Sequence, residues 1–362
     1  MSADVKPLPD HLPILDRPRA RRVYEPVYQE REITAPVDLC DARGELNPAA
    51  VGFARRPLVR ANLSGHWPRK KRWNFWNWIG PDFVFSVTLA DIDLTSFCAF
   101  TLTDLRDGAH WAGSSYGLPG RIALPERVEA SVAFAHAGID YANRIDGTDL
   151  AVRFRGRAGD GTEIAADFAV RRPAGHESLN VVVPWSESRF QCNSKHAALP
   201  CEGEVRAGER RYALDPRSCF AVQDWGRGIW PYRSFWNWGV ATGYAGDDLL
   251  GVNFGAKWTT GTGSSENGIL CNGRLHKIME DLRWDYDPVE WRKPWRVVAD
   301  HSGALDLVLE ASVAHTPRLD LGVLATGGVC AFGRWRGKVR VEGREIAVDG
   351  LVGWAEEFAH RW

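Results

Sequence analysis

The stretch "LAVRFRGRAGDGTEIAADFAV" (Leu150 to Val170) decides the fold class of this 362-residue chain. Apolar side chains recur at every second position on both sides of a Gly159-Asp160-Gly161 turn. A period of two places the apolar side chains on one face of a strand, and the Gly-containing turn joins two such strands. The stretch therefore predicts a β-hairpin with one buried face and one solvated face.

The same pattern recurs along the chain. Residues 305 to 311 alternate in the same way, and turn pairs such as Asn272-Gly273 separate further apolar runs. The segment "GRLHKIMEDLRW" (Gly273 to Trp284) is the best candidate for a helix, but the Asn-Gly pair at its start favours a hairpin. Many short strands joined by Gly-containing turns predict an all-β sandwich or barrel.

One four-residue string occurs twice, as Phe75-Trp76-Asn77-Trp78 and as Phe235-Trp236-Asn237-Trp238, and an apolar run follows each copy. The recurrence predicts two similar β units. The two Trp of each copy share one face of a strand, so each barrel is expected to have an indole-rich wall. We expect an extended, Pro-rich arm at 1–55, a first β domain at 56–205 and a second at 206–362.

Charge and composition exclude several classes of partner. A formal net charge of -1 provides no global field for nucleic acid. The basic runs "RPRARR" (17–22) and "PRKKR" (68–72) could contact an anionic membrane, although short basic runs are usually solvated. Seven Cys without a CxxC pair, and ten His without HxH or HExxH spacing, predict no metal site. No other cofactor is indicated.

The N-terminal stretch lacks the apolar run of a secretory signal, and no segment approaches the roughly 18 to 20 apolar residues of a membrane helix. A cytoplasmic protein is expected. The sequence does not indicate an oligomeric state.

Seventeen Trp predict either a pocket for an apolar molecule or unusually indole-rich packing. They are densest in "CFAVQDWGRGIWPYRSFWNWG" (219–239), where several indoles surround Asp224 in sequence. A carboxyl in apolar surroundings has a raised pKa and can serve as a general acid, and aromatic faces can stabilise a cation. Alternatively, Asp224 forms an ion pair with Arg227 or Arg233, which would lower its pKa and fix a loop.

The expected site therefore has Asp224 as its catalytic residue. The side chains expected to bind the substrate are Trp225, Arg227, Trp230, Tyr232, Arg233, Trp236, Trp238, Asn253, Glu266 and His276.

Other candidates are weaker. His276 and His315 are the His residues best placed for a site, although structural roles are favoured for both. Gly113 to Gly117 fits G-x-S-x-G, but the nucleophile elbow needs a strand-to-helix turn that an all-β chain lacks.

Near the C-terminus, Arg361 is expected to form a structural ion pair with Glu356 or Glu357.

The motif "DWGRGIWP", followed by "FWNWG", resembles an element of carotenoid 1,2-hydratases and tocopherol cyclases. Those proteins have two lipocalin-like units, and their Asp is thought to protonate an isoprenoid double bond. The resemblance extends to Asp224, Trp225 and Gly226, whereas Gln223 stands where hydratases usually have a His or an aromatic residue.

A wider resemblance covers most of the chain. The strings "ENGILCNGRLHKI", "PWRV", "FGRWRGKV" and "LVGWAEEFAHRW" resemble an uncharacterised family, domain of unknown function 2804. The two resemblances together imply tandem lipocalin-like antiparallel barrels.

The leading hypothesis is a cofactor-free, acid-catalysed hydratase, cyclase or isomerase. Its substrate would be an apolar unsaturated molecule, an isoprenoid or a fatty acyl chain, held in a Trp-lined barrel pocket. The alternative is a non-catalytic carrier of a lipid or another hydrophobic small molecule. A third possibility is a scaffold protein that uses its basic arm.

Overall fold

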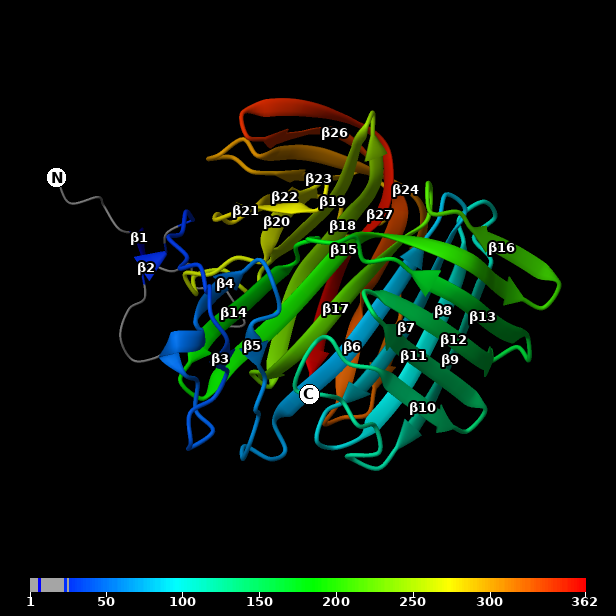
Figure 1. Ribbon diagram of the computed structural model, residues 1–362, viewed down its shortest axis with the longest axis horizontal. Helices are drawn as coiled ribbons and strands as arrows, with labels where there is room; N and C mark the ends of the chain where they lie inside the picture. Colours follow the sequence, from blue (N-terminus) through cyan, green and yellow to red (C-terminus); the bar gives the residue numbers. More distant parts are fainter. Residues whose placement is uncertain (1–5, 8–22, 25) are drawn as a thin grey trace.

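The computed structural model describes residues 6–7, 23–24 and 26–362. Two large antiparallel sheets, here named the first and the second sheet, contain most of this part of the chain (Figure 1). The described residues contain no α-helix and one 3₁₀ turn, η1 (Pro48–Ala50). The predicted all-β class is therefore confirmed, with one sheet forming a nearly closed barrel and the other a half-barrel.

The first sheet has ten strands in its main path and three side strands. In spatial order the path is β10 (Val132–His136), β11 (Ile139–Asp146), β12 (Asp149–Arg157), β13 (Glu163–Val170), β15 (Arg189–Ala207), β17 (Phe220–Ile229), β6 (Lys70–Ile79), β7 (Phe83–Asp91), β8 (Ser96–Asp104) and β9 (His110–Gly117). Beside this path lie β14 (Leu179–Ser186), β16 (Arg210–Leu214) and β4 (Gly52–Ala54).

The second sheet is built from the C-terminal part of the chain. Its order is β21 (Arg274–Ile278), β20 (Asn267–Cys271), β19 (Asp248–Ala256), β18 (Arg233–Ala245), β27 (Arg344–Arg361), β26 (Ala325–Val341), β24 (Leu305–His315), β23 (Trp295–Val298) and β22 (Arg283–Asp285), with β25 (Arg318–Asp320) beside β26. Two small sheets pair β1 (Lys6–Pro7) with β2 (Val23–Tyr24), and β3 (Val37–Asp38) with β5 (Val59–Arg60).

Both predicted hairpins are confirmed. Strands β12 and β13 pair from Leu150 opposite Val170, and the Asn272-Gly273 turn joins β20 to β21. The helical alternative for "GRLHKI" is thus wrong. Asn272 and Gly273 both have positive φ, at 50° and 81°, which the Asn-Gly pair adopts at low cost.

The two sheets repeat one topology, as the repeated FWNW predicted. The first copy lies in β6, which opens the meander β6-β7-β8-β9 and pairs with the late strand β17. The second copy lies in β18, which opens β18-β19-β20-β21 and pairs with the last strand, β27. The chain passes from one sheet to the other between Ile229 and Arg233, and the expected boundary at 205/206 falls within β15.

The two copies of FWNW nevertheless present opposite faces. Trp76 and Trp78 are buried in the apolar core enclosed by the first sheet. Trp236 and Trp238 instead pack in the core between the two sheets. The second copy therefore does not supply the expected indole wall inside the second barrel; the Trp residues in that core are others, such as Trp295 and Trp335. Side chains alternate between the two faces of a strand. A one-residue difference in strand register therefore reverses which side chains of an identical string point to a given face of the sheet.

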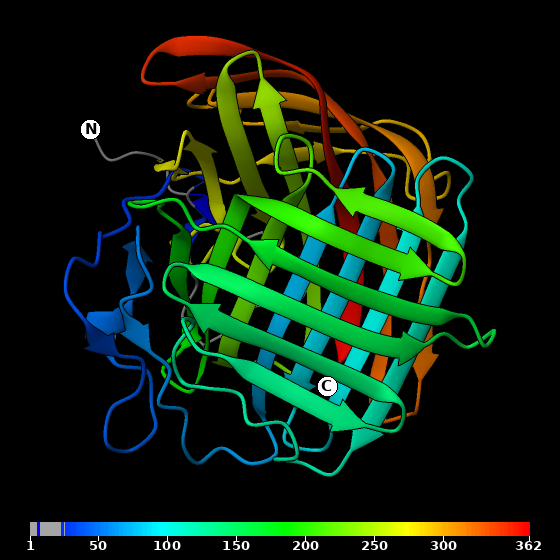
Figure 2. The same ribbon diagram turned by 45° about the vertical axis from the view of Figure 1, so that its right-hand side comes forward.

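The arrangement of layers positions the site. In Figure 2 the strands β10–β13 cross in front of β6–β9, and the red and orange strands of the second sheet lie behind. Strands β6–β9 therefore form a middle layer, with one face toward the first-sheet core and the other toward the second sheet. The inter-sheet core contains Val222, Trp230, Trp238, Phe332 and Trp354, among others.

Part of the expected arm can be described. Leu39 and Val59 pack with Trp225 and Ile229 in a separate apolar cluster on the first sheet. Most of residues 1–25, including the basic run at 17–22, lie outside the described residues.

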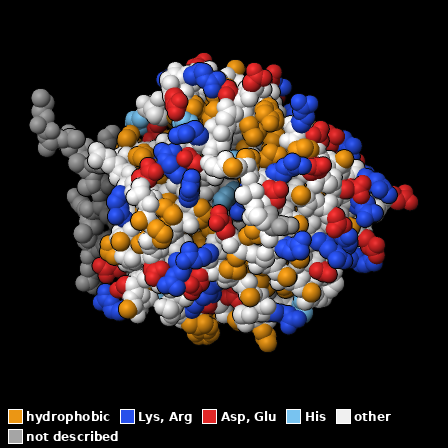
Figure 3. All heavy atoms as spheres, viewed as in Figure 1, with side chains coloured by type: hydrophobic (Ala, Val, Ile, Leu, Met, Phe, Trp, Pro, Cys, Tyr) orange, Lys and Arg blue, Asp and Glu red, His pale blue; other side chains and the backbone are white. Residues whose placement is uncertain are grey.

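The second basic run, 68–72, is engaged within the molecule. Arg69 donates to the carbonyls of Trp230 and Trp362, both at 2.5 Å, and Lys71 is fully buried. On the face drawn in Figure 3, basic and acidic side chains are interspersed, in keeping with the net charge of -1. No helix within the described residues is long and apolar enough to cross a membrane.

Candidate functional site

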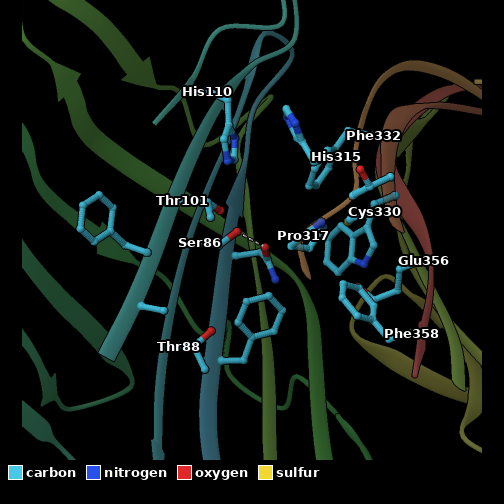
Figure 4. A pocket seen from close by; sticks show the side chains of 16 residues that line it. Ser86, Thr88, Thr101, His110, His315, Pro317, Cys330, Phe332, Glu356 and Phe358 are labelled. Atoms are coloured by element: carbon cyan, nitrogen blue, oxygen red, sulfur yellow. Dashed lines mark hydrogen bonds between the residues drawn. The ribbon is translucent and has the colours of Figure 1, made fainter. Parts of the chain in front are cut away.

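A cavity of about 370 Å³ lies where the middle layer faces the second sheet (Figure 4). Strands β6–β9 supply one wall, and β24, β26 and β27 supply the other. Its aromatic lining consists of Phe75, Phe100, Phe332, Trp354 and Phe358, and its polar lining includes Asn77, Ser86, Thr88, Thr101, His110, His315 and Glu356. An apolar cavity of this volume with a few polar groups is typical of a small-molecule site.

Glu356, on β27, is the carboxyl group that lines this cavity. Its Oε1 accepts a hydrogen bond from Trp236 Nε1 at 2.8 Å. Burial raises the pKa of Glu356 to about 7, against the lowering effects of the Trp236 N–H and of the charge on Lys195. A substantial fraction of this carboxyl is therefore protonated at neutral pH, as a general acid requires.

A buried charged cluster lies next to the cavity, in the inter-sheet core. Lys195 Nζ is 3.1 Å from Asp224 Oδ2, 3.4 Å from Glu266 Oε1 and 3.9 Å from the ring centroid of Trp238. Asn193 Nδ2 donates to Glu266 Oε1 at 2.5 Å. Burial, and next the charge on Asp224, raise the pKa of Glu266, while Lys195 lowers it.

The cavity and the charged cluster share a wall. Asp224 is the ladder partner of Phe75, and Trp238 is the ladder partner of Glu356, so the side chains of each pair project from the same face. The rings of Phe75 and Trp238 lie 6.0 Å apart. Trp238 also contacts Trp354, another cavity residue, at 5.0 Å. Charges in the cluster therefore act on Glu356 over a short distance, and both Asp224 and Glu266 raise its pKa.

Gly226 explains the spacing of the Asp-x-Gly element. The indole of Trp73 lies over Gly226, where a Cβ would come within 2.0 Å of Trp73 Cε2. In this position Trp73 Nε1 donates to Asp224 Oδ2 at 3.0 Å. The glycine thus leaves room for the indole that holds the carboxylate two residues earlier.

Gly226→Ala should therefore displace the Trp73 indole and lower the free energy of unfolding by about 1–3 kcal/mol, the usual cost of overpacking. Denaturant unfolding measures this change. Gly159→Ala is the matched control, because the nearest atom to its Cβ is 3.9 Å away. In a Trp73→Phe background, Gly226→Ala should lower the free energy of unfolding by less than it does in wild type. Equal losses in the two backgrounds would contradict the proposed contact.

Two imidazoles from different sheets meet at the edge of the cavity. The rings of His110 (β9) and His315 (β24) lie 4.0 Å apart. Thr103 Oγ1 is 2.9 Å from His110 Nδ1 and 3.4 Å from His315 Nε2. Desolvation lowers the pKa of both rings, and for His110 the neighbouring His315 lowers it further. The pair is therefore neutral at pH 7 and can accept a proton. His315 is the last residue of β24 and lines the cavity.

The structure brings five of the predicted residues together around Asp224. Trp230 and Trp236 pack at 6.2 Å in the inter-sheet core. Asn253 accepts from Trp238 Nε1 at 2.8 Å and donates to the carbonyl of Glu266 at 2.7 Å.

Five other predicted residues lie elsewhere. Trp225 and Arg227 project from the opposite face of β17, where the guanidinium is 4.1 Å from the indole centroid. Tyr232 and Arg233 are exposed. His276 lies on β21, and the neighbouring Leu275 is the one that packs in the inter-sheet core.

Two predicted ion pairs are corrected. Asp224 pairs with Lys195, rather than with Arg227 or Arg233. Arg361 pairs with Asp320 at 2.9 Å, rather than with Glu356 or Glu357. Both errors arose because the true partners are distant in sequence. Ser115, at the centre of G-x-S-x-G, lies within strand β9 and contacts His136 Nδ1 at 2.8 Å, so no nucleophile elbow forms.

Sequence reasoning missed Lys195, Asn193 and Trp73 as members of the cluster, and Glu356 as an acid. A signal for the first two was present. In "FQCNSKH", Gln191, Asn193 and Lys195 occur at every second position, so three polar side chains share one face of a strand. Such a polar row, where it is buried, indicates a site or an internal ionic network.

The described residues form two large antiparallel sheets with an apolar cavity between them. The chain belongs to the family described as Domain of unknown function (DUF2804), whose profile matches residues 30–362. The wider resemblance noted in the sequence is thereby confirmed. None of the curated proteins matches the chain.

Two solved structures are similar in fold. Kievitone hydratase from Nectria haematococca shares 11% identity, with coverage of 93% of this chain and 98% of that chain and a TM-score of 0.47. CghA with Sch210972 shares 12% identity, with coverage of 81% of this chain and 89% of that chain and a TM-score of 0.44. Likeness at this level concerns the fold alone.

Proposed function

We propose that the protein is a cofactor-free enzyme that protonates a double bond of an apolar substrate in the inter-sheet cavity, leading to hydration, cyclisation or isomerisation. The observation that carries the proposal is Glu356, a carboxyl with a pKa of about 7 in an aromatic cavity. We assign the proton donor to Glu356 and not to Asp224. Asp224 is held as an ion pair by Lys195 and does not line the cavity.

The reaction begins with transfer of the Glu356 carboxyl proton to one alkene carbon. The alkene π electrons form the new C–H bond, leaving a carbocation on the neighbouring carbon and a carboxylate on Glu356. The faces of Phe75, Trp354 and Phe358 can stabilise the cation. In hydration, water adds to the cation and gives up a proton to the imidazole pair, while Glu356 is reprotonated from solvent. In isomerisation, the Glu356 carboxylate takes back a proton from an adjacent carbon. In cyclisation, an internal alkene or hydroxyl adds to the cation, and the proton then lost returns to Glu356.

The imidazole pair at the cavity edge is the proposed proton acceptor for the water. When His110 Nδ1–H donates to Thr103 and the Thr103 hydroxyl donates to His315 Nε2, Nε2 of His110 retains a free lone pair. That nitrogen can accept the proton of the adding water and pass it to solvent, because His110 is exposed.

The volume of the cavity limits the size of the substrate. At about 30 Å³ for each water-sized group, 370 Å³ holds about a dozen non-hydrogen atoms. A short isoprenoid or a medium acyl chain is of this size, whereas a full-length carotenoid is much larger.

The second candidate is a carrier that binds such a molecule without reaction. The apolar cavity is consistent with a carrier as well, but a carrier has no need for a carboxyl with a raised pKa. The two functions differ in whether a proton from solvent reaches carbon.

Incubation in D₂O separates the two candidates. The protein is mixed with geraniol, citronellol or 9-decen-1-ol, each small enough for the cavity; binding is followed by tryptophan fluorescence, and products by mass spectrometry. We expect at least one probe to gain a carbon-bound deuterium, with the mass of D₂O added if the reaction is hydration. Binding without deuterium on carbon supports the carrier, and absence of both contradicts both candidates.

A further inference from the structure

We propose that the cavity anchors an uncharged acceptor oxygen of its ligand at Asn77, so that the ligand is an unsaturated carbonyl compound or a similar oxygenated molecule and not a hydrocarbon. The inference deepens the proposed function, on which its assignment of the ligand as a substrate rests.

The carboxamide of Asn77 is incompletely hydrogen-bonded. Asn77 lies on β6, lines the cavity and is 2% exposed. Its Oδ1 accepts from Ser86 Oγ at 2.5 Å, a bond drawn in Figure 4. Its Nδ2 has no hydrogen-bond partner among the described residues. Buried donors are almost always paired in native proteins, so this one requires a partner that the chain does not supply.

The short contact with Ser86 fixes the orientation of the carboxamide. A separation of 2.5 Å is at the lower end of the range for O–H···O and below the range for N–H···O. The oxygen therefore faces Ser86, and the NH₂ group remains available to the cavity.

The repeated FWNW provides an internal comparison. Asn237 occupies the same place in the second copy, and its Nδ2 donates to the Glu356 carbonyl at 3.0 Å and to Tyr286 Oη at 3.3 Å. The protein thus satisfies the amide of one copy and leaves the other unpaired at a cavity wall.

The lining also indicates the charge of the ligand. It contains no Lys or Arg, and its acidic group is Glu356. A carboxylate or phosphate would find no cation there, whereas a carbonyl, ester or hydroxyl oxygen can accept the Asn77 N–H. Asn77 on β6 and Glu356 on β27 lie on opposite walls, so an oxygen held at Asn77 would orient the rest of the ligand toward the acid.

Two probes with the same carbon number test the inference. Geranial carries an aldehyde oxygen, and myrcene is a hydrocarbon; both have ten carbon atoms and are small enough for the cavity. Binding to the full-length protein is measured by tryptophan fluorescence quenching. We expect wild type to prefer geranial, and Asn77→Leu to weaken geranial binding by about three- to tenfold with little effect on myrcene, as loss of one hydrogen bond predicts.

Thr88→Val, at another polar position of the cavity wall, is the matched control and should keep the preference. If Asn77→Leu does not fold, Asn77→Asp removes the donor while keeping an acceptor for Ser86 and should also lose the preference. Equal binding of both probes by wild type, an unchanged ratio in the Asn77 variants, or failure of both probes to bind would overturn the inference. Because Glu356→Gln should keep the preference, failure of acid catalysis can be distinguished from failure of the oxygen anchor.

Discussion

Glu356→Gln is expected to lower the turnover of a deuterium-accepting substrate by about 10²- to 10⁴-fold, the usual contribution of a general acid. Gln cannot transfer a proton, but its carbonyl oxygen can still accept the Trp236 N–H that now binds Glu356 Oε1 at 2.8 Å. The cavity should therefore keep its shape, and the affinity for geraniol should change little. The rate of deuterium incorporation and the dissociation constant are measured separately.

The neighbouring carboxylate provides the control. Glu357 pairs with Lys257 at 2.5 Å, and its pKa is lowered, so it is ionised at neutral pH. Glu357→Gln should leave turnover near the wild-type rate. If Glu356→Gln turns over as fast as Glu357→Gln, the assignment of the acid is wrong.

Lys195→Met should lower the free energy of unfolding by about 3–5 kcal/mol, because it leaves buried Asp224 and Glu266 without their cation. Denaturant unfolding at pH 7 measures the loss. The double variant Lys195→Met, Asp224→Asn should recover part of it, since the second substitution removes one of the two unpaired carboxylates.

Lys71→Met is the matched comparison. Lys71 is equally buried, but its ammonium donates to one backbone carbonyl, that of Ile92 at 3.2 Å, and burial lowers its pKa to about 7. Lys71→Met should therefore lower the free energy of unfolding by much less than Lys195→Met does. If both variants lose the same amount of the free energy of unfolding, the ion pairs of Lys195 add nothing beyond the effect of removing a buried lysine.

Much of the fold could be predicted because its signals are local. Alternation at Leu150 to Val170 and the Asn272-Gly273 turn each determined a hairpin, and the repeated FWNW indicated the duplicated topology. What could not be predicted was the face that each copy presents, because a strand has two faces and only its pairing partners decide which one is turned inward.

The site was predicted less well for the same reason. Asp224 was singled out from its indole neighbours in sequence, yet Trp225 and Arg227 project from the other face of its strand. Its true partner, Lys195, comes from β15, and Trp73 from β6. Glu356 lies on the last strand, where the sequence suggested an ion pair with Arg361. Cross-strand contacts of this kind depend on sheet order, which a single sequence does not reveal.

The most direct test of the central claim is an infrared titration of the carboxyl groups between pH 4 and pH 9, comparing wild type with Glu356→Gln. We predict that wild type has a protonated-carboxyl band that disappears as the pH rises through about 7, and that this component is missing in Glu356→Gln. Glu266→Gln serves to identify the contribution of the other carboxyl with a raised pKa. A Glu356 component that disappears near pH 4, the usual range for a solvated carboxyl, would contradict the account.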